Sequence, residues 1–260
     1  MYPYVSLSDL YNKDVLYCIF HNLNDRYYIT DDFSPEMYDA LAYNGFISVS
    51  AKDQFNNEFL LPEMQTSYAV LHWENLHIAR RLRHFIKKFI LSDNAYYISI
   101  NDDINAVFDG IKRYHQEKNW MNNSYMNVLK KMYRRTNYLQ TIISVELWHQ
   151  HKIIGGEIGY LTGSIYTSLT GFFDRDNYSN LGKIQLIALA CLLKNVDVAF
   201  WNMGHPYMKY KFDIGAREYA RLDFLDLWWK YRNKKVCRLP SGKKEMKNVL
   251  SDLIGGVCTN

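Results

Sequence analysis

Two features of the sequence are candidates for a catalytic or ligand-binding role: the glycine-rich run Gly155-Gly156-Glu157-Ile158-Gly159, and a histidine in a later loop, His205. An imidazole can accept a proton at neutral pH. The glycines fit neither GxGxxG nor GxxxxGK[ST], and they lie between two predicted strands rather than before a helix, so a phosphate loop is not indicated. Two roles stay open for them, close backbone packing within a sheet and close approach to a ligand. His205 could equally be an ordinary loop histidine.

Other kinds of site are not indicated. The chain has no HExxH or GxSxG motif, and its four cysteines (residues 18, 191, 237 and 258) show no CxxC spacing, so we expect neither a metal site nor a disulfide framework. The most apolar stretch, residues 184–193, is far shorter than the roughly 20 residues of a membrane span, and the first residues do not resemble a secretory signal. We therefore expect a cytoplasmic protein with no membrane segment.

The placement of basic residues tells more than the net charge of +4, which permits a polyanionic partner without requiring one. Apolar residues at helical spacing predict a basic amphipathic helix over 76–91, and a second basic helix follows Trp120. The basic positions of interest are Arg80, Arg81, Arg83, Lys87, Lys88, Lys130 and Lys131. Such faces are often only solvated, but basic helices beside a tryptophan favour nucleic acid, whose phosphates attract cations and whose unpaired bases stack on rings.

The secondary structure predicted around these residues is a mixture of helices and strands. A helix is predicted to begin at Ser34 and Pro35, and others over 105–117, 183–194 and 223–231. Strands are predicted over 96–100, 143–148, 153–163, 164–173 and 196–203, of which the three central ones form an antiparallel meander. The pattern indicates an α+β fold with a small N-terminal domain (1–72) and a larger domain (73–260).

Several motifs occur in an order that resembles a known family. Ser144-Val145-Glu146-Leu147-Trp148, a polar turn and Ile153-Ile154-Gly155-Gly156 with Gly159 and Gly163 are similar to the SxEvW…LvGGxyGxxxG core of the leucyl/phenylalanyl-tRNA–protein transferases. Further similarities are Asp32 to Pro35 with Ala42-Tyr43 and Gly45, Leu76-His77-Ile78-Ala79-Arg80, Trp120, and Ile214-Gly215-Ala216 with Arg221 and Phe224-Leu225. The resemblance covers most of the chain.

The resemblance implies a GNAT-like larger domain with a mainly antiparallel mixed sheet, and transfer of an aminoacyl group from tRNA to a protein's α-amine, which marks that protein for degradation through an N-degron. It implies no metal and no other cofactor. Trp120 would stack on the 3′-terminal adenosine, unless it is a core tryptophan, and the basic helix would meet the acceptor stem. Glu146 and His205 are the candidate catalytic residues. The expected partners of this monomer are aminoacyl-tRNA and acceptor proteins.

One departure from the family concerns the donated amino acid. The family has a methionine after its paired glycines, where this chain has Glu157. A carboxylate in a donor pocket, with Gly155, Gly156 and Tyr166 as neighbours, would be desolvated unless a guanidinium paired with it. We therefore expect arginine as donor in preference to leucine or phenylalanine, unless Glu157 turns outward.

The other departures concern the acceptor and the base. The family's GESMF glutamate is absent from residues 168–173, while Lys209 and Lys211 precede Ile214, which suggests an acceptor site for N-terminal Asp or Glu. The family's DxQ motif is replaced, and His205 could stand in for it as proton acceptor. Two alternatives stay open: a GNAT-like acyl or peptidyl transferase, and an RNA-binding protein without catalysis.

Overall fold

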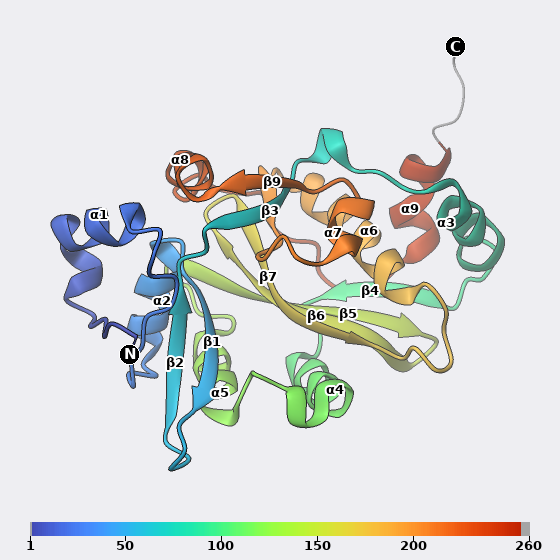
Figure 1. The fold of residues 1–260 in the computed structure, drawn as a ribbon. Coiled ribbons are helices and arrows are strands. Elements are labelled where there is room, and N and C mark those ends of the chain that lie inside the picture. Colours follow the sequence, from blue (N-terminus) through green and yellow to red (C-terminus); the bar gives the residue numbers. More distant parts are fainter. Residues whose placement is uncertain (1, 256–260) are drawn as a thin grey trace.

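A computed structural model describes residues 2–255 (Figure 1). Its helices are α1 (Lys13–His21), α2 (Pro35–Tyr43), α3 (Arg80–Phe85), α4 (Ile104–His115), α5 (Asn123–Met132), α6 (Leu181–Lys194), α7 (Lys209–Asp213), α8 (Arg221–Tyr231) and α9 (Met246–Gly255). Short 3₁₀ turns cover Asp9–Tyr11, Trp73–Asn75 and Gln116–Lys118, and a π-helical turn, Ile86–Ile90, extends α3. The strands are β1 (Ile47–Lys52), β2 (Glu58–Glu63), β3 (Ser67–Leu71), β4 (Tyr96–Ile100), β5 (Gln140–His149), β6 (Lys152–Thr162), β7 (Ile165–Phe173), β8 (Phe200–Asn202), β9 (Arg217–Ala220) and β10 (Lys244–Glu245).

The large sheet has the strand order β10-β4-β5-β6-β7-β8-β3-β9. Its pairs are antiparallel except β7 with β8, because α6 carries the chain from the end of β7 back to the start of β8. The predicted meander is confirmed as β5, β6 and β7, and so is the α+β fold with a mainly antiparallel mixed sheet. The GNAT-like character stays a prediction.

Helices cover both faces of this sheet (Figure 1). On one face, α4 and α5 pack with residues such as Val107 and Leu129 into a cluster that also takes in α2 and α8. On the other face, α3, α6 and α9 pack with residues such as Leu82 and Ile187 into a second cluster. Alternate residues of β5 and β6 therefore point into different cores, which decides which polar side chains can meet.

The N-terminal part holds a separate two-stranded sheet of β1 and β2. Its helix α2 begins as predicted, because the Ser34 side chain accepts a hydrogen bond from the amide of Met37 and Pro35 takes the first turn. Residues of α2 and β2 share the first core cluster with β5 and β6, and β3 already belongs to the large sheet. The predicted boundary at residue 72 stays a prediction, and the end of the second predicted domain, residues 256–260, lies outside the described residues.

Two predicted elements are shorter than expected. The helix predicted over 76–91 begins only at Arg80, because the amide of His77 donates to the Ile214 carbonyl and holds the preceding segment extended. The strand predicted over 196–203 is confined to β8, because the amides of Val196 and Val198 both turn back to the carbonyl of Leu193 at the end of α6. In both places, main-chain hydrogen bonds to another segment shorten the helix or strand that the pattern of apolar residues predicts.

Candidate functional site

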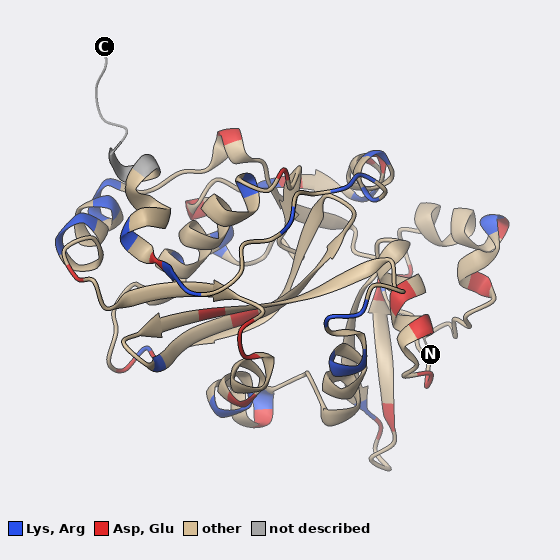
Figure 2. Cartoon of the chain, turned by 180° about the vertical axis from the view of Figure 1, so that it is seen from behind, with Lys and Arg blue, Asp and Glu red and all other residues tan. Residues whose placement is uncertain are grey.

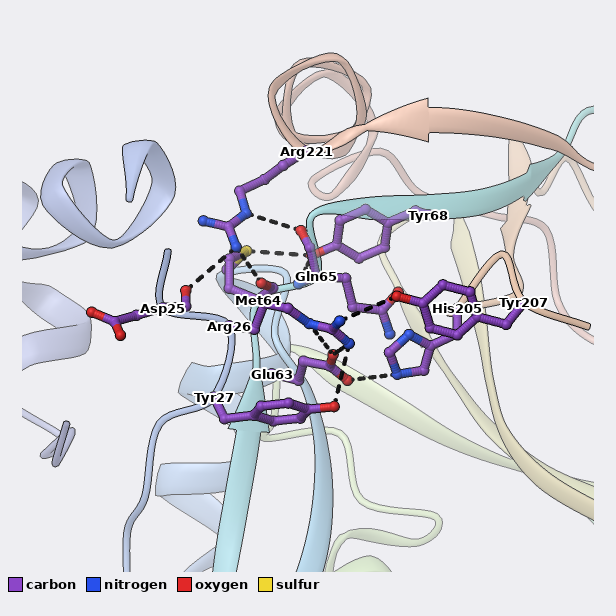
Figure 3. Close-up of polar contacts among 10 residues, drawn as sticks. All are labelled: Asp25, Arg26, Tyr27, Glu63, Met64, Gln65, Tyr68, His205, Tyr207 and Arg221. Atoms are coloured by element: carbon purple, nitrogen blue, oxygen red, sulfur yellow. Dashed lines mark hydrogen bonds and ion pairs between the residues drawn. The ribbon is translucent and has the colours of Figure 1, made fainter. Parts of the chain in front are cut away.

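His205 lies at the junction of the two sheets, after Gly204, whose φ of +71° turns the chain away from β8. Its imidazole Nε2 is 2.8 Å from Oε2 of Glu63, the last residue of β2 (Figure 3). The Glu63 side chain is only 3% exposed, whereas that of His205 is 32% exposed. A buried carboxylate thus holds one imidazole nitrogen of a histidine that solvent and ligands can still reach.

We call these two residues the Glu63–His205 pair. Arg26 and Tyr207 contact the pair and hold it in place. The Arg26 guanidinium donates to Oε1 of Glu63 at 2.5 Å and to the Tyr207 hydroxyl at 3.1 Å, and the Tyr207 ring stacks on the imidazole at 5.2 Å between centroids (Figure 3). Burial alone would raise the pKa of Glu63, but hydrogen bonds from His205 and Arg26 outweigh it and lower that pKa. A charged carboxylate stabilises an imidazole that has accepted a proton, as general-base catalysis requires.

Glu157 of β6 points into the second core, on the face of the sheet that also carries Tyr166 of β7. Tyr166 and Ser168 both donate to its Oε1, at 2.9 and 2.6 Å, and Ser168 in turn accepts from the indole of Trp201. Burial raises the pKa of Glu157 to about 7, although Ser168, Tyr166 and the charge of Lys211 oppose the shift. The side chain is buried, so the alternative that Glu157 turns outward is wrong.

Lys211 of α7 interacts both with the loop that carries His205 and with Glu157. Its ammonium donates to the main-chain carbonyls of Met203 and His205, at 2.5 and 2.6 Å, and is buried. Burial lowers the pKa of Lys211 to about 8, and the charge of Glu157 opposes the shift. The predicted base His205, the predicted acceptor-site residue Lys211 and the predicted donor-pocket residues Glu157 and Tyr166 therefore lie in one neighbourhood, while Lys209 of the same helix is exposed.

The glycines serve close packing. A Cβ at Gly155 would lie 2.8 Å from the Gln185 side chain, and one at Gly156 would lie 2.9 Å from the ring of Phe172. A Cβ at Gly159 would lie 2.4 Å from the Tyr166 hydroxyl. The last contact has a consequence for the site, because only glycine leaves room for the tyrosine that donates to Glu157.

Glu146 lies on the opposite face of the sheet from Glu157, since its neighbour Val145 is the residue that faces Glu157 across the strands. It is fully buried and accepts hydrogen bonds from Ser99 and Ser144 and from the amides of Asp102 and Asp103, just before α4. Burial raises its pKa, and these hydrogen bonds oppose the shift. The structure thus separates Glu146 from His205, its predicted catalytic companion.

The predicted RNA-binding residues are also divided between the two faces. Trp120 is half-buried against the first core, with its ring edge-on to Tyr125 of α5, and Lys130 and Lys131 of α5 are exposed. Helix α3 packs on the second core, and its basic residues gather at one end of the molecule (Figure 2). The side chains of Arg80, Arg81, Lys87 and Lys88 are exposed and that of Arg83 is half-buried.

Sequence reasoning missed Glu63, Arg26 and Tyr207. A signal existed for Glu63, an acid directly after the apolar run Phe59-Leu60-Leu61-Pro62 in a strand that has to be partly buried. Nothing local marks Arg26, whose partners lie on β2 and in the loop after β8. Such long-range pairs leave no periodic trace in one sequence.

Arg221, part of the motif at the end of the family-like region, is a structural residue in the same area (Figure 3). The residue is 1% exposed, and its guanidinium donates to main-chain carbonyls of two separate segments. These carbonyls belong to Gln65, Met64, Ile19, Asn22 and Asp25. One side chain therefore ties α1 and the loop after it to the connection between β2 and β3.

Open hollows lie elsewhere on the molecule. One of about 680 Å³ is lined by α4 residues and Trp148, and another of about 530 Å³ by residues 236–242 with Arg134. Neither is lined by His205 or Glu157. Within residues 2–255, no group of His, Cys, Asp and Glu side chains is arranged to hold a metal ion, and no helix is long and apolar enough to cross a membrane.

Comparison with known proteins places the chain among transferases. Residues 51–228 match the family described as leucyl/phenylalanyl-tRNA protein transferase. Proteins of that name from Salmonella newport and Shigella sonnei are 24% and 27% identical over 160 and 176 residues, which are 61% and 66% of this chain. The chain spans 62% and 67% of their lengths. A solved C-terminal domain (DUF2156) from Agrobacterium fabrum, from a protein titled a lysylphosphatidylglycerol synthetase, aligns with a TM-score of 0.44 and 11% identity over 89% of this chain and 82% of that one.

Proposed function

Because the chain belongs to the leucyl/phenylalanyl-tRNA–protein transferase family, we propose that it transfers an amino acid from charged tRNA to the N-terminal α-amine of an acceptor protein. The amine nitrogen attacks the ester carbonyl, a C–N bond forms, and the C–O bond to the ribose breaks. The amine gives up a proton, and the ribose oxygen takes one up as it leaves. Aminoacyl-tRNA is then the co-substrate, no metal or other cofactor takes part, and the enzyme acts as a monomer in the cytoplasm.

The observation that carries this mechanism is the Glu63–His205 pair. In the proposal the partly exposed imidazole accepts the amine proton and passes it to the leaving ribose hydroxyl. Glu63 keeps the ring oriented and stabilises its protonated form, while the stacked Tyr207 prevents the ring from turning. Positioning of amine and ester supplies the rest of the rate, as in other aminolysis reactions between bound partners.

The donor amino acid is a finer part of the proposal. Glu157 supports a cationic donor such as arginine, because a buried carboxylate is stabilised by a guanidinium placed beside it. Lys211 already supplies a positive charge to this carboxylate from within the protein. An arginine donor would therefore have to share Glu157 with Lys211, whereas a leucine or phenylalanine donor would leave the two as they are.

The test is transfer of radiolabelled arginine, leucine and phenylalanine from charged tRNA to peptides that begin with Asp, Glu, Arg or Lys. We expect transfer by the wild type, loss of at least about 100-fold in His205→Ala, and a change of donor preference toward leucine in Glu157→Met. Transfer of leucine or phenylalanine alone would keep the transferase and overturn the arginine preference. Binding of tRNA without any transfer would overturn the enzymatic proposal.

A further inference from the structure

The proposed base, His205, extends from a tight turn of the main chain. The turn runs from Met203 to His205 and bends at Gly204, whose φ is +71°. The carbonyl of Gly204 accepts a hydrogen bond from the amide of Ala69 in β3. The carbonyls on either side, those of Met203 and His205, both accept from the ammonium of Lys211, at 2.5 and 2.6 Å. One side chain therefore closes the turn that carries the imidazole.

Lys211 can hold this turn because its own helix, α7, is anchored at its far end. Asp213 of α7 forms an ion pair with Lys183 of α6 at 2.8 Å. Just after the helix, Gly215 has a φ of +107°, and a Cβ at this position would lie 1.8 Å from the carbonyl oxygen of Asn75. The backbone there packs directly on another segment, so the ammonium reaches the turn from a fixed helix.

The ammonium of Lys211 is fully engaged within the protein. The residue is 5% exposed, and the charge of the buried Glu157 also acts on it. An ammonium has three N–H groups, of which two donate to the carbonyls of the turn, and burial keeps water from replacing them. A carboxylate of an acceptor peptide could bind Lys211 only by displacing both contacts. These contacts favour a role within the protein over one in binding the acceptor.

We propose that Lys211 is a positioning residue for the proposed base, because it fixes the turn that directs the His205 imidazole at Glu63. The inference rests on the proposed function and adds to it a residue that touches no substrate. The imidazole is held by Glu63 (Figure 3), and the main chain of the same residue is held by Lys211. Without the ammonium, two buried carbonyls lose their donor and the turn rearranges to satisfy them. A displacement of about 1 Å at a catalytic group can cost about 100-fold in rate.

The kinetic test compares Lys211→Ala and Lys211→Met with Lys194→Met, a control at an exposed position of α6. Lys211→Ala should lower kcat for transfer by about 100-fold and leave the KM values for charged tRNA and acceptor peptide within about threefold. Lys194→Met should behave as the wild type.

Chemical rescue separates a missing ammonium from general damage. Propylammonium supplies the atoms that Lys211→Ala lacks, and it should raise kcat of this variant by about tenfold. It should not rescue Lys211→Met, whose side chain fills the space, or His205→Ala. Product is counted on the acceptor peptide, so any ester attacked by propylamine itself is excluded.

Proton NMR gives a readout that needs no transfer. Glu63 accepts from Nε2 of His205, and this N–H should give a downfield resonance in the wild type that is absent from His205→Ala. Both Lys211 variants should lose the resonance, and propylammonium should restore it in Lys211→Ala. Urea unfolding shows which variants are folded. Lys211→Met keeps the volume of the side chain and carries the test if Lys211→Ala does not fold.

The proposal is overturned if folded Lys211→Met keeps the resonance or the wild-type kcat, or if propylammonium restores neither in folded Lys211→Ala. It is also overturned if the Lys211 variants raise only the KM for acceptor peptide, which would assign Lys211 to the acceptor site. A wild type that transfers nothing, but loses the resonance in Lys211→Met, defeats the proposed function alone. A wild type whose transfer is unchanged in Lys211→Met defeats this inference alone.

Discussion

The imidazole of His205 and the carboxylate of Glu63 meet at 2.8 Å although they come from different parts of the fold, a loop after β8 and the last residue of β2. The contact forms only when the two-stranded sheet is docked on the large sheet. The proposed base is therefore assembled by the same packing that holds the N-terminal part in place.

Replacing Glu63 by Gln should lower the rate of transfer by about 10- to 100-fold, because the imidazole loses the charge that orients it and stabilises its protonated form. The matched control is Glu58→Gln, on the same strand, where the glutamate pairs with the exposed Lys52. Equal rates of transfer for the two variants would contradict a positioning role for Glu63.

The buried pair of Glu157 and Lys211 predicts a local minimum in stability between about pH 7 and 8. The raised pKa of Glu157, about 7, means that the folded state binds more protons than the unfolded state above pH 4.5, so stability falls as the pH rises toward 7. The lowered pKa of Lys211, about 8, means that the unfolded state binds more protons between pH 8 and 10.5, so stability rises there.

The measurement is urea unfolding from pH 5 to 10. Glu157→Gln should remove the fall below pH 7, which is on the order of 2 kcal/mol. Lys211→Met should remove the rise above pH 8. Two other buried acids act in the same pH range: the lowered pKa of Glu63 makes stability rise with pH, and the raised pKa of Glu146 makes it fall. A wild-type stability that still increases steadily from pH 5 to 7 after both are allowed for would rule out the assignment.

Glu146→Gln should act on stability rather than on catalysis. All the groups that meet its two oxygens are donors, so an amide NH₂ in place of one oxygen leaves a hydroxyl and a backbone N–H without an acceptor, at a cost of about 2 kcal/mol. Transfer per folded molecule should stay within about threefold of the wild type. Glu117→Gln, at an exposed site, is the control for stability. Loss of transfer with unchanged stability would restore Glu146 as a catalytic residue.

Charge reversal on α3 and the π-helical turn that extends it should weaken tRNA binding, because both pack on the same face of the sheet as Tyr166 and the carboxylate of Glu157. Arg80→Glu with Lys87→Glu should reduce the slope of log K against log salt by about 2, one unit for each lost phosphate contact. Lys130→Glu with Lys131→Glu, on the opposite face, is the matched control and should leave the slope unchanged. The reverse result would place the RNA across α5.

The sheet could be predicted from the sequence because its strands alternate or run apolar over β5 to β7, and the helices α4, α6 and α8 because their apolar faces repeat at helical spacing. The candidate site could be predicted only in part. His205, Glu157 and Lys211 stand out as polar groups in or beside apolar segments, but Glu63 and Arg26 acquire their roles only from partners far away in the chain. The separation of Trp120 from α3 likewise follows from which face each element covers, which one sequence does not display.

Arg221 imposes an order on how the protein can be completed during synthesis. The carbonyls of Ile19, Asn22 and Met64 emerge from the ribosome long before the Arg221 guanidinium that donates hydrogen bonds to them. Until Arg221 is buried beside them, these carbonyls bind water instead. The N-terminal segment can be secured only after α8 has been made. Truncation before α8 should therefore release the front of the chain to proteases, although the cut lies at the other end of the sequence.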